Sequence, residues 1–282
     1  MDEHIMEALG RTKIIIRNGR IVEIGEPMIN SCPLAIRFDQ PVKSFSKDEI
    51  IRNIENRIKK FGMFTKDRII TSNEDFVPFG ASELISFGLK KSIINGAVIV
   101  CDGAGTVVTN NPYLVQGIGG RMSGLIKTSP IIEVIEKIEK EGGIVLDKEN
   151  ATINQVMGIE LAYKIWSSNI AVTVINANDA EAIRRKFFDA LILATHLTGI
   201  SKEEAERLTE VCDLITGCAS KWVREYAGRK AIMQAGVSIP VFAMSERGRD
   251  LILAKLKELK HQFIVKLEKL PYITSNQPSP LV

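Results

Sequence analysis

From about residue 150 onward, short apolar runs alternate with segments of helical character, and this alternation is the feature that most limits how the chain can fold. The apolar runs span residues 170–175, 190–195, 213–216 and 239–243. Strands that are joined by helices pair in parallel through right-handed crossovers. The sequence therefore predicts an α/β protein with a mainly parallel sheet, or sheets, covered by helices.

The first half of the chain is less regular. Two apolar runs flank Asn18-Gly19, a dipeptide that accepts the positive φ angles of a type I′ turn and so indicates an N-terminal β-hairpin. Ser46 and Glu49 have capping-box spacing ahead of apolar residues at helical intervals. The predicted elements are a hairpin over 13–25, a helix over 47–60, a strand over 95–101 and a helix over 130–141 that starts at Pro130.

The length of 282 residues and a hydrophobic content of 45% are typical of a globular protein with a packed core. We predict two lobes and a tail. The N-terminal α/β lobe spans 1–150 and contains a glycine-rich loop, the βα-repeating lobe spans 151–270, and the loose tail spans 271–282.

Charge and hydropathy limit the partners. The chain has 37 basic and 34 acidic residues, a formal net charge of +3, so no protein-wide positive field favours nucleic acid or an anionic membrane. No signal peptide is recognisable at the N-terminus, and no apolar run approaches the roughly 20 residues of a membrane-spanning helix. We expect a cytoplasmic protein and leave its oligomeric state open.

Ligands of open α/β sheets usually bind beyond the carboxyl ends of the parallel strands. Loops follow the predicted strands at 102–106, 176–179, 195–196, 216–220 and 245–247. An anionic or phosphate-bearing small molecule is the predicted ligand, because glycine loops let backbone N–H groups approach an anion and arginine binds it bidentately. The candidate binding residues are Asp102, Gly103, Gly105, Thr106, Gly119, Gly120, Arg121 and Ser220. Tight turns without a ligand are the alternative, since both nucleotide-binding glycine fingerprints are absent.

Two residues are candidates for catalysis. Cys218 lies between a predicted strand and a helix that begins near Ser220, where helix N-terminal amides and the nearby Lys221 and Arg224 favour a thiolate. His196 follows an apolar strand and is suited to acid or base chemistry near neutral pH. Packing for the cysteine and a structural hydrogen bond for the histidine are the alternatives, so whether the protein is an enzyme stays open.

Four cysteines raise the question of a metal. Cys32, Cys101, Cys212 and Cys218 are too few for a disulfide scaffold, and their spacing matches no recognised zinc or iron–sulfur motif. Because three of them lie at loop junctions, assembly of an iron–sulfur cluster or a zinc site in three dimensions is a hypothesis, and core packing is the alternative.

The sequence resembles the archaeal family called methanogenesis marker protein 8, a domain of unknown function, over nearly its whole length. The resemblance is carried by residues 1–4, 32–34, 61–63, 100–107, 114–121 and 215–220. It implies a methane-producing archaeon and an accessory role in the assembly, activation or modification of methyl-coenzyme M reductase, with that enzyme or its maturation factors as partners. A small-molecule enzyme with an anionic ligand at the strand ends is the alternative function.

Overall fold

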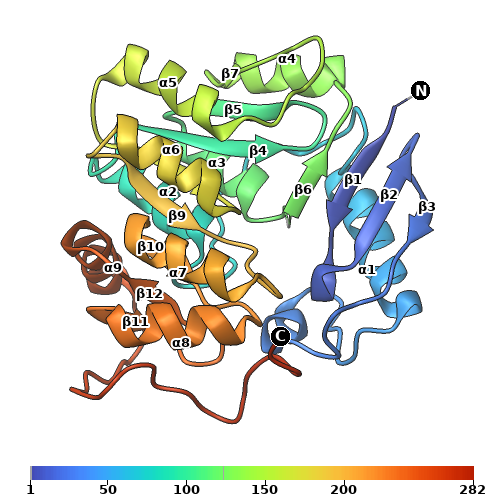
Figure 1. Cartoon of the computed structure of the whole chain (residues 1–282). Helices are drawn as coiled ribbons and strands as arrows, with labels where there is room; N and C mark the ends of the chain where they lie inside the picture. Colours follow the sequence, from blue (N-terminus) through green and yellow to red (C-terminus); the bar gives the residue numbers. More distant parts are fainter. Residues whose placement is uncertain (1, 123) are drawn as a thin grey trace.

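The computed structural model describes residues 2–122 and 124–282, which form two sheets and a set of helices packed mainly around the larger sheet (Figure 1). The smaller sheet is antiparallel, with strand order β3-β2-β1-β6. Its strands are β1 (His4–Glu7), β2 (Lys13–Arg17), β3 (Arg20–Ile24) and β6 (Gly124–Lys127). The β2–β3 hairpin confirms the predicted turn, since Asn18 and Gly19 have φ angles of 49° and 68°.

The larger sheet has the order β11-β12-β10-β9-β8-β4-β5-β7. Its strands are β4 (Gly96–Cys101), β5 (Gly105–Thr109), β7 (Ile144–Val145), β8 (Ile170–Val174), β9 (Leu191–Ala194), β10 (Leu214–Thr216), β11 (Met233–Ala235) and β12 (Val241–Ala243). The four central strands β10, β9, β8 and β4 are parallel, whereas the pairs on both sides are antiparallel. The predicted α/β class is confirmed, with parallel pairing confined to the centre of the sheet.

The direction of β12 differs from the prediction. Residues 239–243 were expected to end at the same edge as the other strands, but β12 runs antiparallel to β10. The reason is the short connection from β11, residues 236–240, because a parallel crossover needs a dozen or more residues. The loop 245–247 consequently lies at the opposite edge of the sheet, where Ser245 Oγ donates a 2.6 Å hydrogen bond to Asp213.

Helices account for much of the rest of the chain. They are α1 (Lys47–Phe61), α2 (Ala81–Lys90), α3 (Pro112–Gly119), α4 (Ile132–Lys140), α5 (Gln155–Trp166), α6 (Ala177–Lys186), α7 (Lys202–Val211), α8 (Lys221–Lys230) and α9 (Glu246–Glu258), with short 3-10 turns η1 (Leu9–Arg11) and η2 (Pro33–Arg37). Helix α1 begins as predicted, because Ser46 Oγ accepts the Glu49 N–H at 3.3 Å. Helix α4 begins two residues after Pro130, because Ile131 is still extended.

The core divides into three apolar clusters. One lies between the larger sheet and α2, α3, α4 and α9, and a second lies between the opposite face of that sheet and α5 to α8. Successive side chains of β4 point to opposite faces of the sheet and so contribute to both clusters. Ala97 and Ile99 belong to the first cluster and Val98 to the second. The third cluster fills the space between the smaller sheet and α1.

The two sheets do not divide the chain at residue 150. Strands β4, β5 and β7 precede that position, and they share a sheet with β8 to β12, which follow it. The segment 279–282, part of the predicted loose tail, hydrogen-bonds to Ser31 and to Ala219. Within the described residues, no helix has the length and apolar character needed to cross a bilayer.

Candidate functional site

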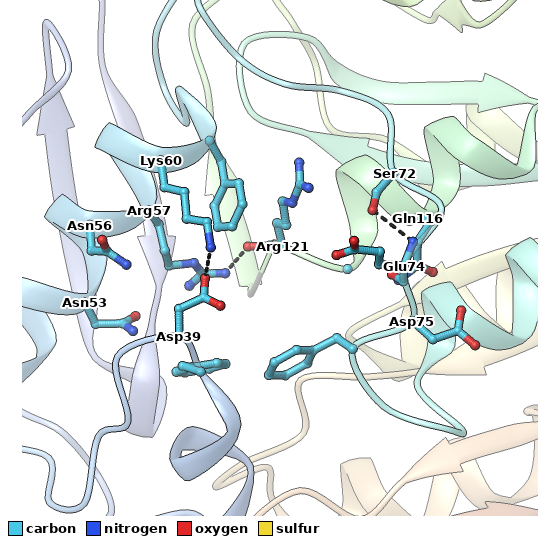
Figure 2. A pocket seen from close by; sticks show the side chains of 14 residues that line it. Asp39, Asn53, Asn56, Arg57, Lys60, Ser72, Glu74, Asp75, Gln116 and Arg121 are labelled. Atoms are coloured by element: carbon cyan, nitrogen blue, oxygen red, sulfur yellow. Dashed lines mark hydrogen bonds and ion pairs between the residues drawn. The ribbon is translucent and has the colours of Figure 1, made fainter.

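A pocket of about 320 Å³ lies between α1 and the C-terminal end of α3 (Figure 2), and we call it the Arg57 pocket. Its volume is at the lower end of the range found for small-molecule sites. The side chains that line it are basic (Arg57, Lys60, Arg121), amide (Asn53, Asn56, Gln116), aromatic (Phe38, Phe61, Phe76), acidic (Asp39, Glu74, Asp75) or small (Ser72, Gly120).

One wall of the pocket is a face of α1. Asn53, Arg57 and Lys60 recur at spacings of four and three residues, which places them on the same side of a helix. The isoleucines of α1 that pack into the third cluster hold the helix against the smaller sheet. This polar stripe was not recognised in the sequence, because charged and amide residues on a helix face usually contact only solvent.

Arg57 is an unusual member of this wall. Its Nη2 donates a hydrogen bond to the backbone carbonyl of Arg121, but its Nη1 is buried and has no hydrogen-bond partner in the described part of the chain. Burial and, to a smaller extent, the positive charge of Arg68 lower the pKa of Arg57 to about 10, although Asp102 opposes the change. The side chain therefore carries donor capacity and charge that the fold does not use.

Arg121 lies next to Arg57, and the contacts of its guanidinium with the described residues are weak. Its guanidinium is 4.1 Å from the centre of the Phe61 ring, and its Nη1 donates to the carbonyl of Ile69 at 3.3 Å. Burial and the charge of Arg68 lower the pKa of Arg121, while the charges of Glu74 and Asp39 oppose the change. Among residues 2–122 and 124–282, no carboxylate oxygen lies within 4.0 Å of either the Arg57 or the Arg121 guanidinium.

Two of the three acidic residues of the pocket form ion pairs with lysines. Asp39 forms an ion pair with Lys60, and Asp75 forms one with Lys255 from α9. Glu74 lies on the side of the pocket opposite α1 (Figure 2), where its backbone carbonyl accepts a 2.9 Å hydrogen bond from Gln116. Of the basic residues of the pocket, Arg57 and Arg121 are thus the two without an ion pair among the described residues.

Two amide oxygens of the pocket also lack partners. Asn53 Oδ1 and Gln116 Oε1 are buried and accept no hydrogen bond from the described residues, although Gln116 donates through its nitrogen. An unsatisfied buried polar atom costs about 1–3 kcal/mol, and such atoms are few in folded proteins. Together with Arg57 Nη1 they form a group of donors and acceptors suited to a bound polar molecule.

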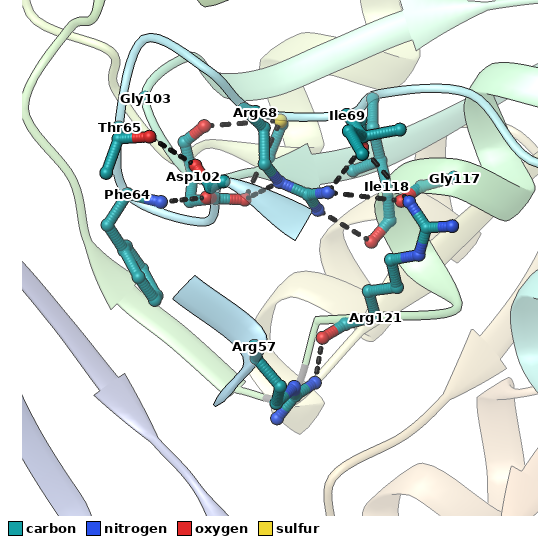
Figure 3. Close-up of polar contacts among 12 residues, drawn as sticks. Arg57, Phe64, Thr65, Arg68, Ile69, Asp102, Gly103, Gly117, Ile118 and Arg121 are labelled. Carbon is teal, nitrogen blue, oxygen red and sulfur yellow. Dashed lines mark hydrogen bonds and ion pairs between the residues drawn. The ribbon is translucent and has the colours of Figure 1, made fainter. Parts of the chain in front are cut away.

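A buried network lies beside Arg57 and Arg121 (Figure 3). Arg68 and Asp102 have fully buried side chains, and Arg68 Nε donates to Asp102 Oδ1 at 2.8 Å. The other carboxylate oxygen of Asp102 accepts the N–H of Phe64 at 2.7 Å. Arg68 also donates to the carbonyls of Ile69, at 2.6 Å, and of Gly117 near the end of α3. The network fixes the segment that presents Arg121.

The loop 102–106 uses its polar groups within the fold. Besides Asp102, the N–H of Gly103 donates to Thr128 Oγ1 at 2.7 Å, and Thr106 Oγ1 donates to Gln155 at 3.0 Å. Gly105 has a φ of 70°, and a Cβ there would lie 2.1 Å from the carbonyl oxygen of Ala151. The structure places this loop as the β4–β5 hairpin turn, away from the lining of the Arg57 pocket.

The remaining predicted binding residues divide between the pocket and other places. Gly120 and Arg121 line the pocket, and Gly119 ends α3 and packs on Ser82. Ser220 caps the N-terminus of α8, where its hydroxyl accepts the N–H of Val223 at 3.2 Å. Only the end of the predicted glycine-rich segment therefore contributes to the pocket.

The two predicted catalytic residues lie close together, but their side chains contact different groups. His196 Nε2 lies 2.8 Å from Glu7 Oε2, which joins the carboxyl end of β9 to the smaller sheet. Backbone N–H groups of His196 and Leu197 lower the pKa of the Cys218 thiol, but burial, the larger effect, raises it. His196 and Cys218 both have positive φ, 59° and 41°.

The four cysteines do not share one site. Cys101 belongs to the apolar cluster on one face of the larger sheet and Cys212 to the cluster on the other. Cys32 packs against the third cluster, and both it and Cys218 are partly exposed. Within the part of the chain that the structure describes, no three histidine, cysteine or acidic side chains are placed to hold a metal ion together.

Comparison with known proteins places the chain in a family. A family model described as an uncharacterized protein conserved in archaea, DUF2099, matches residues 4–257. The chain belongs to this family. It is 47% identical to an uncharacterized protein of Methanocaldococcus jannaschii over 285 residues, which cover 100% of both chains. No solved structure matches the chain.

Proposed function

We propose that the chain binds a small molecule carrying a phosphate or carboxylate group in the Arg57 pocket. The observation that carries this proposal is a pair of guanidinium groups that have no carboxylate within 4.0 Å among the described residues, one of which has a buried Nη1 without a partner there. Burying a charge without a counter-charge is unfavourable, and planar guanidinium groups bind phosphate and carboxylate bidentately. An anion between Arg57 and Arg121 supplies the missing acceptor.

The rest of the pocket indicates what else the ligand contains. The rings of Phe38 and Phe76 stack with centres 5.3 Å apart, and Phe61 lies under Arg121, so apolar surface adjoins the charged group. Asn53 and Gln116 offer unpaired amide oxygens to a hydrogen-bond donor. We therefore expect an anionic metabolite with an apolar or planar portion and at least one hydroxyl or amine.

The test is anaerobic calorimetry of the whole protein with phosphate, pyrophosphate and a panel of nucleotides, phosphorylated metabolites and carboxylate metabolites. At least one compound should bind the wild type, and the affinity should fall about 10- to 100-fold in Arg57→Gln and in Arg121→Gln, because each loses a charge-assisted hydrogen bond of about 1.5–3 kcal/mol. Arg52→Gln is the matched control, since Arg52 is an exposed residue of the same helix that pairs with Glu49. Absence of binding across the panel, or equal binding by all three variants, would refute the proposal.

The role in methanogenesis implied by the family resemblance is a second proposal. It is supported by the full-length similarity to a protein of Methanocaldococcus jannaschii and by the archaeal range of the family. Deletion of the gene in a methane-producing host should impair maturation of methyl-coenzyme M reductase, and affinity purification should recover components of that enzyme. Normal growth with active reductase and no such partner would contradict it.

A further inference from the structure

A second cluster of reactive groups lies around Cys32, Cys218 and Arg224, and none of these residues lines the Arg57 pocket. Two of the four cysteines are buried in separate apolar clusters, whereas Cys32 and Cys218 are the two that are partly exposed. The two cysteine residues that are partly exposed are therefore the two that lie in this cluster, although burial is the larger influence on the pKa of both thiols.

The C-terminal segment 279–282 brings the two cysteines to the same place. The N–H of Ser279 donates to Ser31, the residue before Cys32, at 3.1 Å. The N–H of Val282 donates to Ala219, the residue after Cys218, at 2.9 Å. An extended chain advances about 3.3 Å per residue, so four residues bind both cysteine-bearing loops within roughly 10 Å along the segment. Figure 1 shows this red segment ending beside the blue part of the chain.

Arg224 of α8 is the charged group of the cluster. The residue is only 2% exposed, and its Nη2 donates to the carbonyls of Cys218, at 2.7 Å, and of Ser238, at 3.1 Å. Its Nε and Nη1 are buried without a hydrogen-bond partner in the described residues. Burial lowers the pKa of Arg224, and ionised Cys218 or Cys32 would raise it. The thiols are thus the groups that can supply its counter-charge.

The backbone around Cys218 is also unusual. Its φ of 41° places a non-glycine residue in the left-handed region, two residues before the capping Ser220 of α8. Such conformations cost about 1–3 kcal/mol and concentrate at functional sites. Burial raises the pKa of the Cys32 thiol, and an ionised Cys218 raises it as well, while N–H groups of Leu34 and Ala35 lower it. Each thiol therefore senses the charge of the other or of Arg224.

We propose that Cys32 and Cys218 form a redox-active dithiol that exchanges with small-molecule disulfides, with Arg224 as its positioning residue. The Cys218 thiolate attacks one sulfur of the substrate disulfide, whose S–S bond breaks, and the first thiol leaves after taking up a proton. The Cys32 thiolate then attacks Cys218 Sγ and displaces the second thiol. Two electrons and two protons pass from the protein to the substrate, and a Cys32–Cys218 disulfide remains.

The test uses the reduced whole protein, 2-hydroxyethyl disulfide as the probe, acid quenching and peptide mapping by mass spectrometry. The wild type should lose two hydrogens and yield one cross-linked peptide pair containing Cys32 and Cys218. Cys32→Ser should stop at a mixed disulfide on Cys218, and Cys218→Ser should form no cross-link. Cys101→Ser and Cys212→Ser are the matched controls and should react as the wild type does.

The role of Arg224 is tested by the pH dependence of the exchange rate. Loss of the cation in Arg224→Gln should raise the pH at which the rate is half-maximal and slow the reaction about 10-fold at fixed pH, and Arg224→Lys should restore most of the rate. A folded wild type without a Cys32–Cys218 cross-link, or one that reacts mainly at Cys101 or Cys212, would overturn the dithiol. An Arg224→Gln protein with the wild-type rate and pH profile would overturn the positioning role.

Discussion

At the scale of single residues, Asp102 has a role other than the one its sequence context suggested. It follows a strand and precedes glycine, which is typical of a ligand-binding loop, yet its side chain is fully buried against Arg68. Through Arg68 it holds the carbonyl of Gly117, four residues before Arg121. Asp102 thus affects the Arg57 pocket by fixing the backbone that leads to Arg121, and not by contacting a ligand itself.

Replacing Asp102 by Asn should therefore destabilise the protein strongly. The change leaves the buried Arg68 without a counter-charge at nearly constant volume, and breaking a buried ion pair in this way costs about 3–5 kcal/mol. Urea unfolding measures the free energy of unfolding. Glu139→Gln removes an exposed pair with Lys148 and should cost less than about 1 kcal/mol, so similar losses in the two variants would contradict the argument.

At the scale of elements, α3 positions the pocket because its glycines permit close packing. A Cβ at Gly117 would lie 2.3 Å from the backbone oxygen of Ile70, so the helix and the segment before it are in direct backbone contact. The segment from Arg68 to Ile70 and the end of α3 are therefore packed directly against each other. Arg121 lies two residues after the end of α3, so this backbone contact determines where Arg121 lies in the pocket.

Gly117→Ala should destabilise the protein by about 1–3 kcal/mol, because the neighbour is backbone and cannot rotate away. An unhindered helical glycine would instead gain about 0.5–1 kcal/mol from the same change. Gly25→Ala is the control, since its Cβ would meet its nearest atom at 3.5 Å and it has no positive φ. Chemical denaturation of both variants decides between these outcomes, and a stabilised Gly117→Ala protein would show that the backbone contact is absent.

At the scale of the whole molecule, a contact between a carboxylate and a histidine joins the two sheets. Glu7 of β1 contacts His196, which follows β9, and Arg11 also donates to its carboxylate at 2.9 Å. Burial raises the pKa of Glu7, but the hydrogen bond from His196 and the charges of His196 and Arg11 outweigh it, so the pKa lies below its usual value. Ionised Glu7 therefore stabilises the contact between the sheets.

The stabilisation that this Glu7 contact contributes should be lost in acid. A carboxylate whose pKa is lowered in the folded state stabilises that state above its unfolded pKa of about 4.3 and loses this contribution as the pH falls through the folded value. The free energy of unfolding of the wild type should exceed that of Glu7→Gln near neutral pH, and the difference should shrink below about pH 4.3. A difference that is constant between neutral and acid pH would show that Glu7 contributes nothing through its charge.

The sequence by itself determined the local elements and the α/β class of this protein. Asn18-Gly19 and the cap at Ser46 act over a few residues, and the alternation of strands and helices predicted the parallel centre of the larger sheet. Each of these signals depends on neighbours along the chain, where backbone preferences and periodicity are visible.

The candidate sites depended on the tertiary structure. Arg57 of α1 contacts Arg121 after α3, and the C-terminal segment 279–282 hydrogen-bonds both to Ser31, next to Cys32, and to Ala219, next to Cys218. The residues of each site thus come from segments far apart in the sequence. The direction of β12 likewise followed from its pairing with β10 and β11 rather than from its own residues. Whether a polar residue contacts solvent or faces an unpaired charge is decided by which distant segments fold against it.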